Sequence, residues 1–202
     1  MAETDWHRHS IRISYGELDN VANMDAVDTY RDLSFGSDAE LGIAFCTVLE
    51  PSLDLEIGLY QIESEGIRLN RIGSGNEQNY INTAVDTKRL FITLRRRFRD
   101  KHKLFVPWVS GGIHGGVLQT EEQEFIGAPM GAIGQRLLTK RSSIYGVHAG
   151  AGVDLYPLEE SALALVFESR YNLSYVSSPF SGDINSLAFL FGLKWDFGTT
   201  TF

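Results

Sequence analysis

The chain has little of what several classes of protein need. Its 202 residues contain a single cysteine, Cys46, which excludes an internal disulfide and a cysteine-based zinc site. No apolar run reaches the roughly 18 residues that a transmembrane helix requires. Basic residues are outnumbered, with 18 Lys and Arg against 26 Asp and Glu and a net charge of -8. This balance argues against a general nucleic-acid binder, which would carry a basic face.

The start of the chain also lacks a secretory signal. Residues 1–5 are mostly polar and no apolar stretch follows them. Such a start fits a cytoplasmic protein and equally an exported chain whose leader has been removed. Hydrophobic residues make up 43% and aromatic residues 11% of the chain, a content that excludes a disordered protein. The length favours a single domain over residues 1–202.

What the sequence does contain is a repeated alternation of apolar residues with small or charged residues, the signal of β-strands. In the clearest segment, large apolar residues hold the odd positions from Leu187 to Phe197. The pattern predicts eight strands, near 9–17, 39–49, 53–62, 88–99, 103–118, 142–156, 161–176 and 185–197. Short connections alternate with long ones over 18–38, 63–87 and 119–141. This order indicates up-and-down strands whose short turns share one end.

Two architectures fit these strands, and they differ in which face is inside. A soluble lipocalin-like cup buries its apolar face, whereas an outer-membrane barrel turns that face to lipid. The small-or-charged face includes Gly146 and Gly150, which suit a crowded interior. The apolar face carries aromatic residues near strand ends, such as Tyr15, Tyr175 and Trp195, as membrane-interface girdles do. The sequence therefore favours an all-β, eight-stranded antiparallel up-and-down transmembrane β-barrel with short periplasmic turns and long extracellular loops.

This interpretation sorts the side chains into a lumen set and a lipid-facing set. Because the interior of an eight-stranded barrel is only wide enough for side chains, inward charges must pair. We expect a lumen charge network of Arg12, Glu40, Asp54, Glu56, Arg95, Arg97, Asp154, Glu168, Arg170, Lys194 and Asp196. We expect lipid-facing side chains at Leu165, Phe167, Leu187, Phe189, Phe191, Leu193, Trp195 and Phe197. Within the network, Glu56 and Arg95 are predicted to meet.

No group of residues predicts catalysis, a cofactor or a metal. His7 and His9 form an HxH pair near the start of the chain, which is a weak metal signal. His148 beside Ser174 or Glu168 is the nearest approach to a catalytic triad, which needs a base held by an acid and placed beside a hydroxyl. We therefore expect no catalytic residue, no cofactor and no metal ligand.

Several segments resemble the OmpA/OmpX-like outer-membrane β-barrel domains of Gram-negative bacteria. Residues 143–156, 164–172 and 187–197 are similar to the last three strands of that family, and Pro107–Gly112 to its Pro-aromatic-x-x-Gly strand. The resemblance implies export with a signal peptide, insertion by the barrel assembly machinery, and an outer-membrane location among lipid and lipopolysaccharide. Family members end on an aromatic residue in register with the outer face. Phe197 holds that register and Phe202 does not, so both are candidates for the assembly signal.

The function that follows is a structural or surface-interaction barrel with a lumen filled by side chains. We expect a monomer that contacts an extracellular protein or host partner through its loops 18–38, 63–87 and 119–141, and binds no nucleic acid. Two alternatives from other classes stay open. One is a narrow conduit for small solutes, and the other is a lipid A-modifying barrel enzyme.

Overall fold

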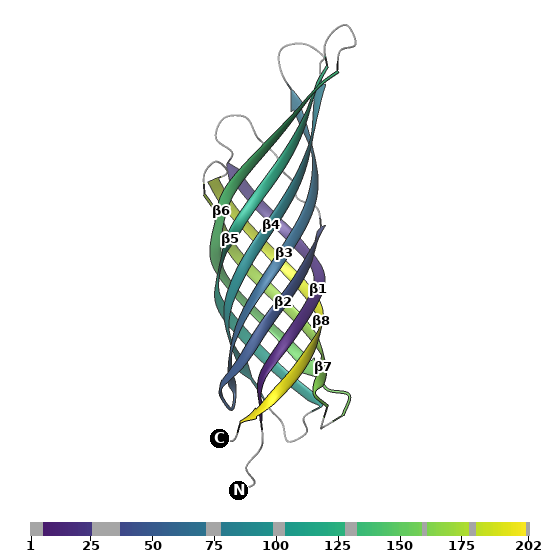
Figure 1. The fold of residues 1–202 in the computed structure, drawn as a ribbon. Helices are drawn as coiled ribbons and strands as arrows, with labels where there is room; N and C mark the ends of the chain where they lie inside the picture. Colours follow the sequence, from purple (N-terminus) through teal and green to yellow (C-terminus); the bar gives the residue numbers. More distant parts are fainter. Residues whose placement is uncertain are drawn as a thin grey trace.

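The fold comes from a computed structural model that describes residues 6–25, 37–71, 78–98, 104–127, 133–158, 161–177 and 181–200. It has eight strands: β1 (Trp6–Asp25), β2 (Ser37–Glu50), β3 (Leu53–Arg71), β4 (Gln78–Arg97), β5 (Phe105–Gly127), β6 (Ile133–Leu155), β7 (Leu163–Val176) and β8 (Ser181–Thr200). Each strand pairs with the next, and β8 pairs with β1, so the sheet closes into a barrel (Figure 1). The predicted all-β, eight-stranded antiparallel up-and-down barrel is confirmed. In the part of the chain described, no helix is long and apolar enough to cross a membrane.

β1 begins and β8 ends at the same end of the barrel, which we call the terminal end; the opposite end is the far end (Figure 1). The tilt of the strands follows from the residues that are paired between neighbouring strands. A path through these pairs that goes once around the barrel returns to its first strand at a different residue. A path that leaves β1 at Arg12 passes through Ala44, Gly58, Phe91, His114, Gly146, Ser174 and Ile184 and returns to β1 at Ala22. A shift of ten residues over eight strands corresponds to a tilt of about 40° and a radius of about 8 Å. A cylinder this narrow is filled by its own side chains.

The alternation of residues puts polar side chains inside this cylinder and apolar ones outside. On β7, Glu168 and Arg170 are buried while Leu165 and Phe167 are exposed. Such a distribution is the reverse of that in a soluble cup, whose apolar face is covered. The soluble alternative therefore does not describe this chain.

At the far end, β3, β4, β5 and β6 extend much further than the sequence predicted, and β8 also begins earlier, at Ser181. β3 continues to Arg71 and β4 begins at Gln78, while β5 continues to Gly127 and β6 begins at Ile133. The prediction of loops over 63–87 and 119–141 is therefore wrong for most of those residues, and β1 also extends to Asp25. The reason is that a strand outside lipid needs no apolar face, so the alternation fades while backbone pairing continues.

Two neighbouring glycines on β5 have opposite roles. A Cβ atom on Gly116 would lie 1.9 Å from the carbonyl oxygen of Lys88 on β4, so a side chain there would force the two strands apart. Gly115 points outward, and a Cβ atom on it would meet only the carbonyl oxygen of Ile144, at 3.8 Å. The first glycine permits close packing, whereas the second leaves space on the outer surface.

Candidate functional site

The centre of the lumen is an interlocked set of charged side chains. The Glu56 carboxylate accepts a hydrogen bond from Arg12 Nη2 at 2.6 Å and another from Arg95. Arg12 Nη1 donates to Glu168 Oε2 at 2.7 Å, so one guanidinium joins acids of β3 and β7 across the barrel. Arg12 also donates to the Tyr60 hydroxyl at 2.8 Å. All of these side chains are buried, so each charge depends on its partners rather than on water.

A second group lies toward the terminal end, around Asp154. Its carboxylate accepts hydrogen bonds from Lys194 Nζ at 2.8 Å and from Trp108 Nε1 at 2.9 Å. Lys194 Nζ is also 3.3 Å from Asp196 Oδ1. The Tyr156 hydroxyl accepts from Lys194 at 2.9 Å and donates to Asp196 at 2.6 Å. Aromatic side chains therefore complete the partners of this ionic group.

The remaining ion pairs extend the network in both directions. Arg170 pairs with Glu40, and its Nη1 lies 3.7 Å from Glu168 Oε1. Arg97 Nη2 lies 2.7 Å from Asp54 Oδ1 near the terminal end. The structure thus brings every residue of the predicted lumen network into contact with an opposite charge of that network. The predicted lipid-facing residues are all exposed except Phe197, which is half-buried.

Sequence reasoning missed one arginine in the lumen. Arg89 is buried, and its Nε and Nη1 atoms have no hydrogen-bond partner in the described part of the chain. The signal was present, because Arg89 shares the odd positions of β4 with Phe91 and Arg95. It was missed because it falls at the start of the predicted strand, where the direction of a side chain is least certain.

The lumen histidines pair differently from the arrangement considered above. His114 Nε2 hydrogen-bonds Ser174 Oγ at 2.9 Å, and His148 Nε2 hydrogen-bonds Thr93 Oγ1 at 2.9 Å. The Nδ1 atoms of both rings have no hydrogen-bond partner among the described residues. A serine–histidine pair without an acid on the other ring nitrogen is not a triad. The described residues also contain no cluster of His, Cys, Asp or Glu able to hold a metal ion; the side chain of His7 lies outside them.

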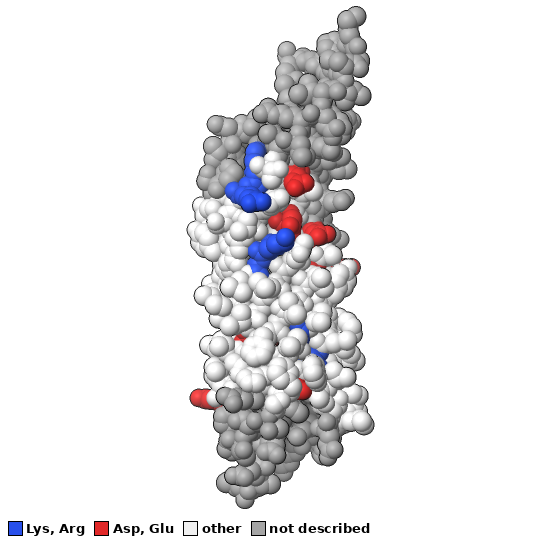
Figure 2. Space-filling view, viewed as in Figure 1, with Lys and Arg blue, Asp and Glu red and all other residues white. Residues whose placement is uncertain are grey.

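The outer surface carries a broad apolar band. Exposed apolar side chains recur along β7 from Leu163 to Tyr175. At about 3.3 Å per residue and a tilt of about 40°, this length spans roughly 30 Å, the thickness of a bilayer's hydrocarbon core. In the space-filling view, charged side chains gather above a largely uncharged surface (Figure 2). The barrel therefore presents to its surroundings the surface that a membrane requires.

On the side formed by β1 to β5, the edge of this band can be followed in three rows of outward-facing residues. Each row consists of one residue from each strand, paired in register with its neighbours. The row nearest the far end is mostly acidic or polar and consists of Glu17, Ala39, Glu63, Asp86 and Gln119. The next row is mixed and consists of Tyr15, Leu41, Gln61, Lys88 and Val117. The third row is apolar throughout and consists of Ile13, Ile43, Leu59, Leu90 and Gly115. The surface thus changes from charged to apolar within two rows.

Comparison with known proteins identifies the fold. The chain matches no protein-family model and no curated protein. Among solved structures it is similar to the outer membrane protein OprG from Pseudomonas aeruginosa, with a TM-score of 0.56 and 12% identity over 95% of this chain and 97% of that one. It is also similar to Neisserial surface protein A (NspA), with a TM-score of 0.54 and 9% identity over 96% of this chain and 100% of that one.

At these identities the similarity is one of fold. It is the fold of small outer-membrane β-barrels, so the OmpA/OmpX-like resemblance read from the sequence is confirmed at that level. The fold together with the apolar band identifies the chain as an outer-membrane barrel, because a closed sheet with an apolar exterior satisfies its backbone groups in lipid.

Proposed function

We propose that the protein is a structural, surface-interaction barrel of the outer membrane, with a closed lumen and a contact surface at its far end. The observation that carries the proposal is a four-stranded sheet that continues beyond the apolar band. β3 pairs with β4 up to Arg71 and Gln78, and β5 pairs with β6 up to Gly127 and Ile133. β4 and β5 stay paired as far as Ile81 and Glu124. The two hairpins project together past the other strands (Figure 1).

The outer edges of this projecting sheet support a binding role. The pairing of β2 with β3 ends at Ala39 and Glu63, and that of β6 with β7 ends at Ile144 and Val176. Beyond those points β3 pairs only with β4 and β6 only with β5, so no described strand covers the outer edge of either one. An open edge offers unpaired N–H and C=O groups with which a strand of an extracellular protein or host partner can pair. The predicted contact segments 63–87 and 119–141 largely coincide with this sheet.

Shortening one projecting hairpin should weaken surface attachment and leave the barrel intact. In the variant, residues 65–84 are replaced by Asn-Gly, so that the paired residues Ser64 and Val85 flank a two-residue turn. Cells that display the variant should adhere to cultured epithelial cells about tenfold less than cells that display the wild type. The control replaces the terminal-end turn 51–52 with Asn-Gly and should leave adhesion unchanged. Equal adhesion by all three proteins would contradict the proposed role of the sheet.

A closed lumen is supported by what fills it. Trp108, Arg95, Arg170 and Phe91 are among the largest fully buried side chains, and the ionic network ties strands together across the interior. The wild-type protein reconstituted in a planar bilayer should therefore show no stable single-channel conductance, whereas a water-filled porin treated in the same way should. Reproducible conductance steps would favour the narrow conduit instead.

The enzyme alternative has less support. The Ser174–His114 pair is buried in the lumen and lacks an acid on the free ring nitrogen, so the hydroxyl has no complete activating arrangement.

The protein's surroundings would be outer-membrane lipid and lipopolysaccharide around the band, with the barrel assembly machinery acting during insertion.

A further inference from the structure

One edge of the projecting sheet stays open along β6. Residues 133–142 of β6 pair with β5 but with no other described strand, and we call them the open edge. Only residues 177–180 join β7 to β8, and the first of them, Ser177, donates its backbone N–H to the Ser143 carbonyl oxygen at 2.9 Å. So short a connection reaches at most about 14 Å, whereas the open edge is about 34 Å long. The connection therefore cannot cover it.

The backbone groups of the open edge point away from β5 at every second residue. Ser143 accepts from the Ser177 N–H, and its own N–H donates to Ser177 Oγ at 3.1 Å, so both backbone groups of Ser143 face β7. The register of β6 with β5 has no shift along the edge. The odd-numbered residues Arg141 and Thr139 therefore also turn their N–H and C=O groups away from β5. Such groups can pair with an added strand.

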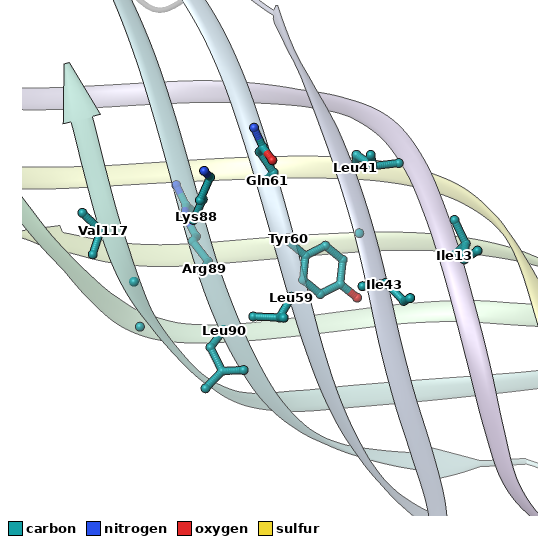
Figure 3. Close-up of a pocket in the computed structure, with 13 residues that line it drawn as sticks. Ile13, Leu41, Ile43, Leu59, Tyr60, Gln61, Lys88, Arg89, Leu90 and Val117 are labelled. Carbon is teal, nitrogen blue, oxygen red and sulfur yellow. The ribbon is translucent and has the colours of Figure 1, made fainter. Parts of the chain in front are cut away.

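The open edge lies beyond the apolar band. On β6 the last exposed apolar side chain of the band is Tyr145, and the exposed residues that follow it toward the far end are Ser143, Arg141 and Thr139. Figure 3 shows the same change on β3 and β4, where Gln61 and Lys88 come after the apolar row. An added strand would therefore meet the edge in water and not in lipid.

The open edge carries charge of one sign. Its sequence contains Arg136, Lys140 and Arg141 and no acid. Successive residues of a strand point to opposite faces, so Lys140 and Arg141 place a cation on each face of the sheet. β5, on the covered side, is acidic over the same length, with Glu121, Glu122 and Glu124. An acidic strand beside β6 would continue this alternation, and opposite charges on directly opposed residues stabilise strand pairing.

We propose that the open edge of β6 binds an extended, acidic segment of a partner protein, which pairs with it as an additional strand of the projecting sheet. The proposal rests on the surface-contact role proposed above, and it specifies the edge and the charge of the partner. A second copy of this chain is not complementary, because its own β6 edge would bring the same cations against these. The edge of β3 is also less selective, since residues 64–71 carry both signs, with Glu65, Arg68 and Arg71.

The test measures peptide binding to the full-length protein refolded in detergent. Two fluorescent peptides of about ten residues are compared, one alternating threonine with glutamate and the other alternating threonine with lysine. Fluorescence anisotropy should show that the wild type binds the glutamate peptide about tenfold more tightly. The triple variant Arg136→Gln, Lys140→Gln, Arg141→Gln should bind the two peptides equally. Equal binding of both peptides by the wild type would overturn the assignment of an acidic partner.

A proline variant tests strand pairing apart from charge. Thr139→Pro removes one N–H group of the open edge, leaves the charge unchanged and should weaken binding of the glutamate peptide about tenfold. The matched control is Ile67→Pro on β3. On β3 the even-numbered residues face β4, since the Arg97 N–H donates to the Ser52 carbonyl oxygen, so the N–H of Ile67 also faces an open edge. This control should bind the peptide like the wild type, and a loss there instead of at Thr139 would overturn the choice of β6.

Undiminished binding by Thr139→Pro would mean that charge alone holds the peptide, as it would hold an acidic polysaccharide, and would overturn strand pairing. Hydrogen exchange of the wild type, followed by NMR, gives the same decision without a substitution, because the bound peptide should slow exchange of the Thr139 and Arg141 amides. The outcome is separable from that of the surface-contact role. Peptide selectivity together with unchanged adhesion of the variant lacking residues 65–84 would contradict that role alone. Reduced adhesion without peptide selectivity would overturn only the β6 site.

Discussion

Replacing Glu56 with glutamine should destabilise the barrel by about 3–5 kcal/mol, or less where lumen water reaches the site. The carboxylate accepts hydrogen bonds from both Arg12 and Arg95, and all three side chains are buried. A neutral amide leaves two buried guanidinium groups short of an opposite charge, and burial makes each of them costly. The free energy of unfolding can be measured by urea titration of the protein in lipid vesicles.

A double-mutant cycle separates this contact from general damage. Arg95→Gln alone should also be costly, and the double variant Glu56→Gln, Arg95→Gln should be less destabilised than the sum of the single variants. The hydrogen bond from Arg12 to Glu168 involves neither substituted residue, so we expect all of these proteins to retain it. The control is the same cycle on the outer-surface pair of exposed Lys88 and half-buried Asp86, whose coupling should stay below about 1 kcal/mol. Additive losses at Glu56 and Arg95 would mean that the two side chains do not meet.

Arginine in place of Phe191 should cost about 2–4 kcal/mol, as expected for a charge at the middle of the lipid-facing band. Phe191 is 48% exposed and its neighbours in register are Tyr15 on β1 and Phe167 on β7. No acid is opposite it in either neighbouring strand. Arginine at Phe189 should cost less, because Phe189 is paired in register with the exposed Glu17. Unfolding by urea in lipid vesicles again provides the measurement.

Two controls define the faces of the sheet. Ala39 lies in the row of mostly acidic or polar residues beyond the band, so Ala39→Arg should change the free energy of unfolding little. Ala164 is buried in the lumen beside Lys194, so Ala164→Arg should destabilise the barrel by crowding and charge repulsion. Equal tolerance of arginine at Phe191 and Ala39 would show that the exposed surface around Phe191 does not face lipid.

Much of this architecture was accessible from the alternation alone. A strand turns successive side chains to opposite faces, so Phe189 and Leu190 must lie on different sides of the sheet whatever their neighbours are. The assignment of Glu56, Arg95 and Glu168 to a common face follows from the same periodicity, as does the count of eight strands. The face with the charges then has to be the interior, because lipid accepts the other one.

The partners of those charges depended on closure of the barrel. Arg12 bonds Glu56 and Glu168, which are 44 and 156 residues away in the chain, and only the register and the ten-residue shift bring them to one level. The same three-dimensional alignment assigned Ser174 to His114 rather than to His148.

The ends of the strands also depended on tertiary structure. β3 and β4 stay paired up to Arg71 and Gln78. Beyond the apolar band neither face of these strands has to be apolar, so the sequence there shows no alternation of apolar and polar residues from which the strands could be predicted. The sequence by itself therefore determined which face of each strand meets lipid, since that is a property of single residues in order. Only the closed barrel decided which residues meet one another, because those contacts join strands far apart in the chain.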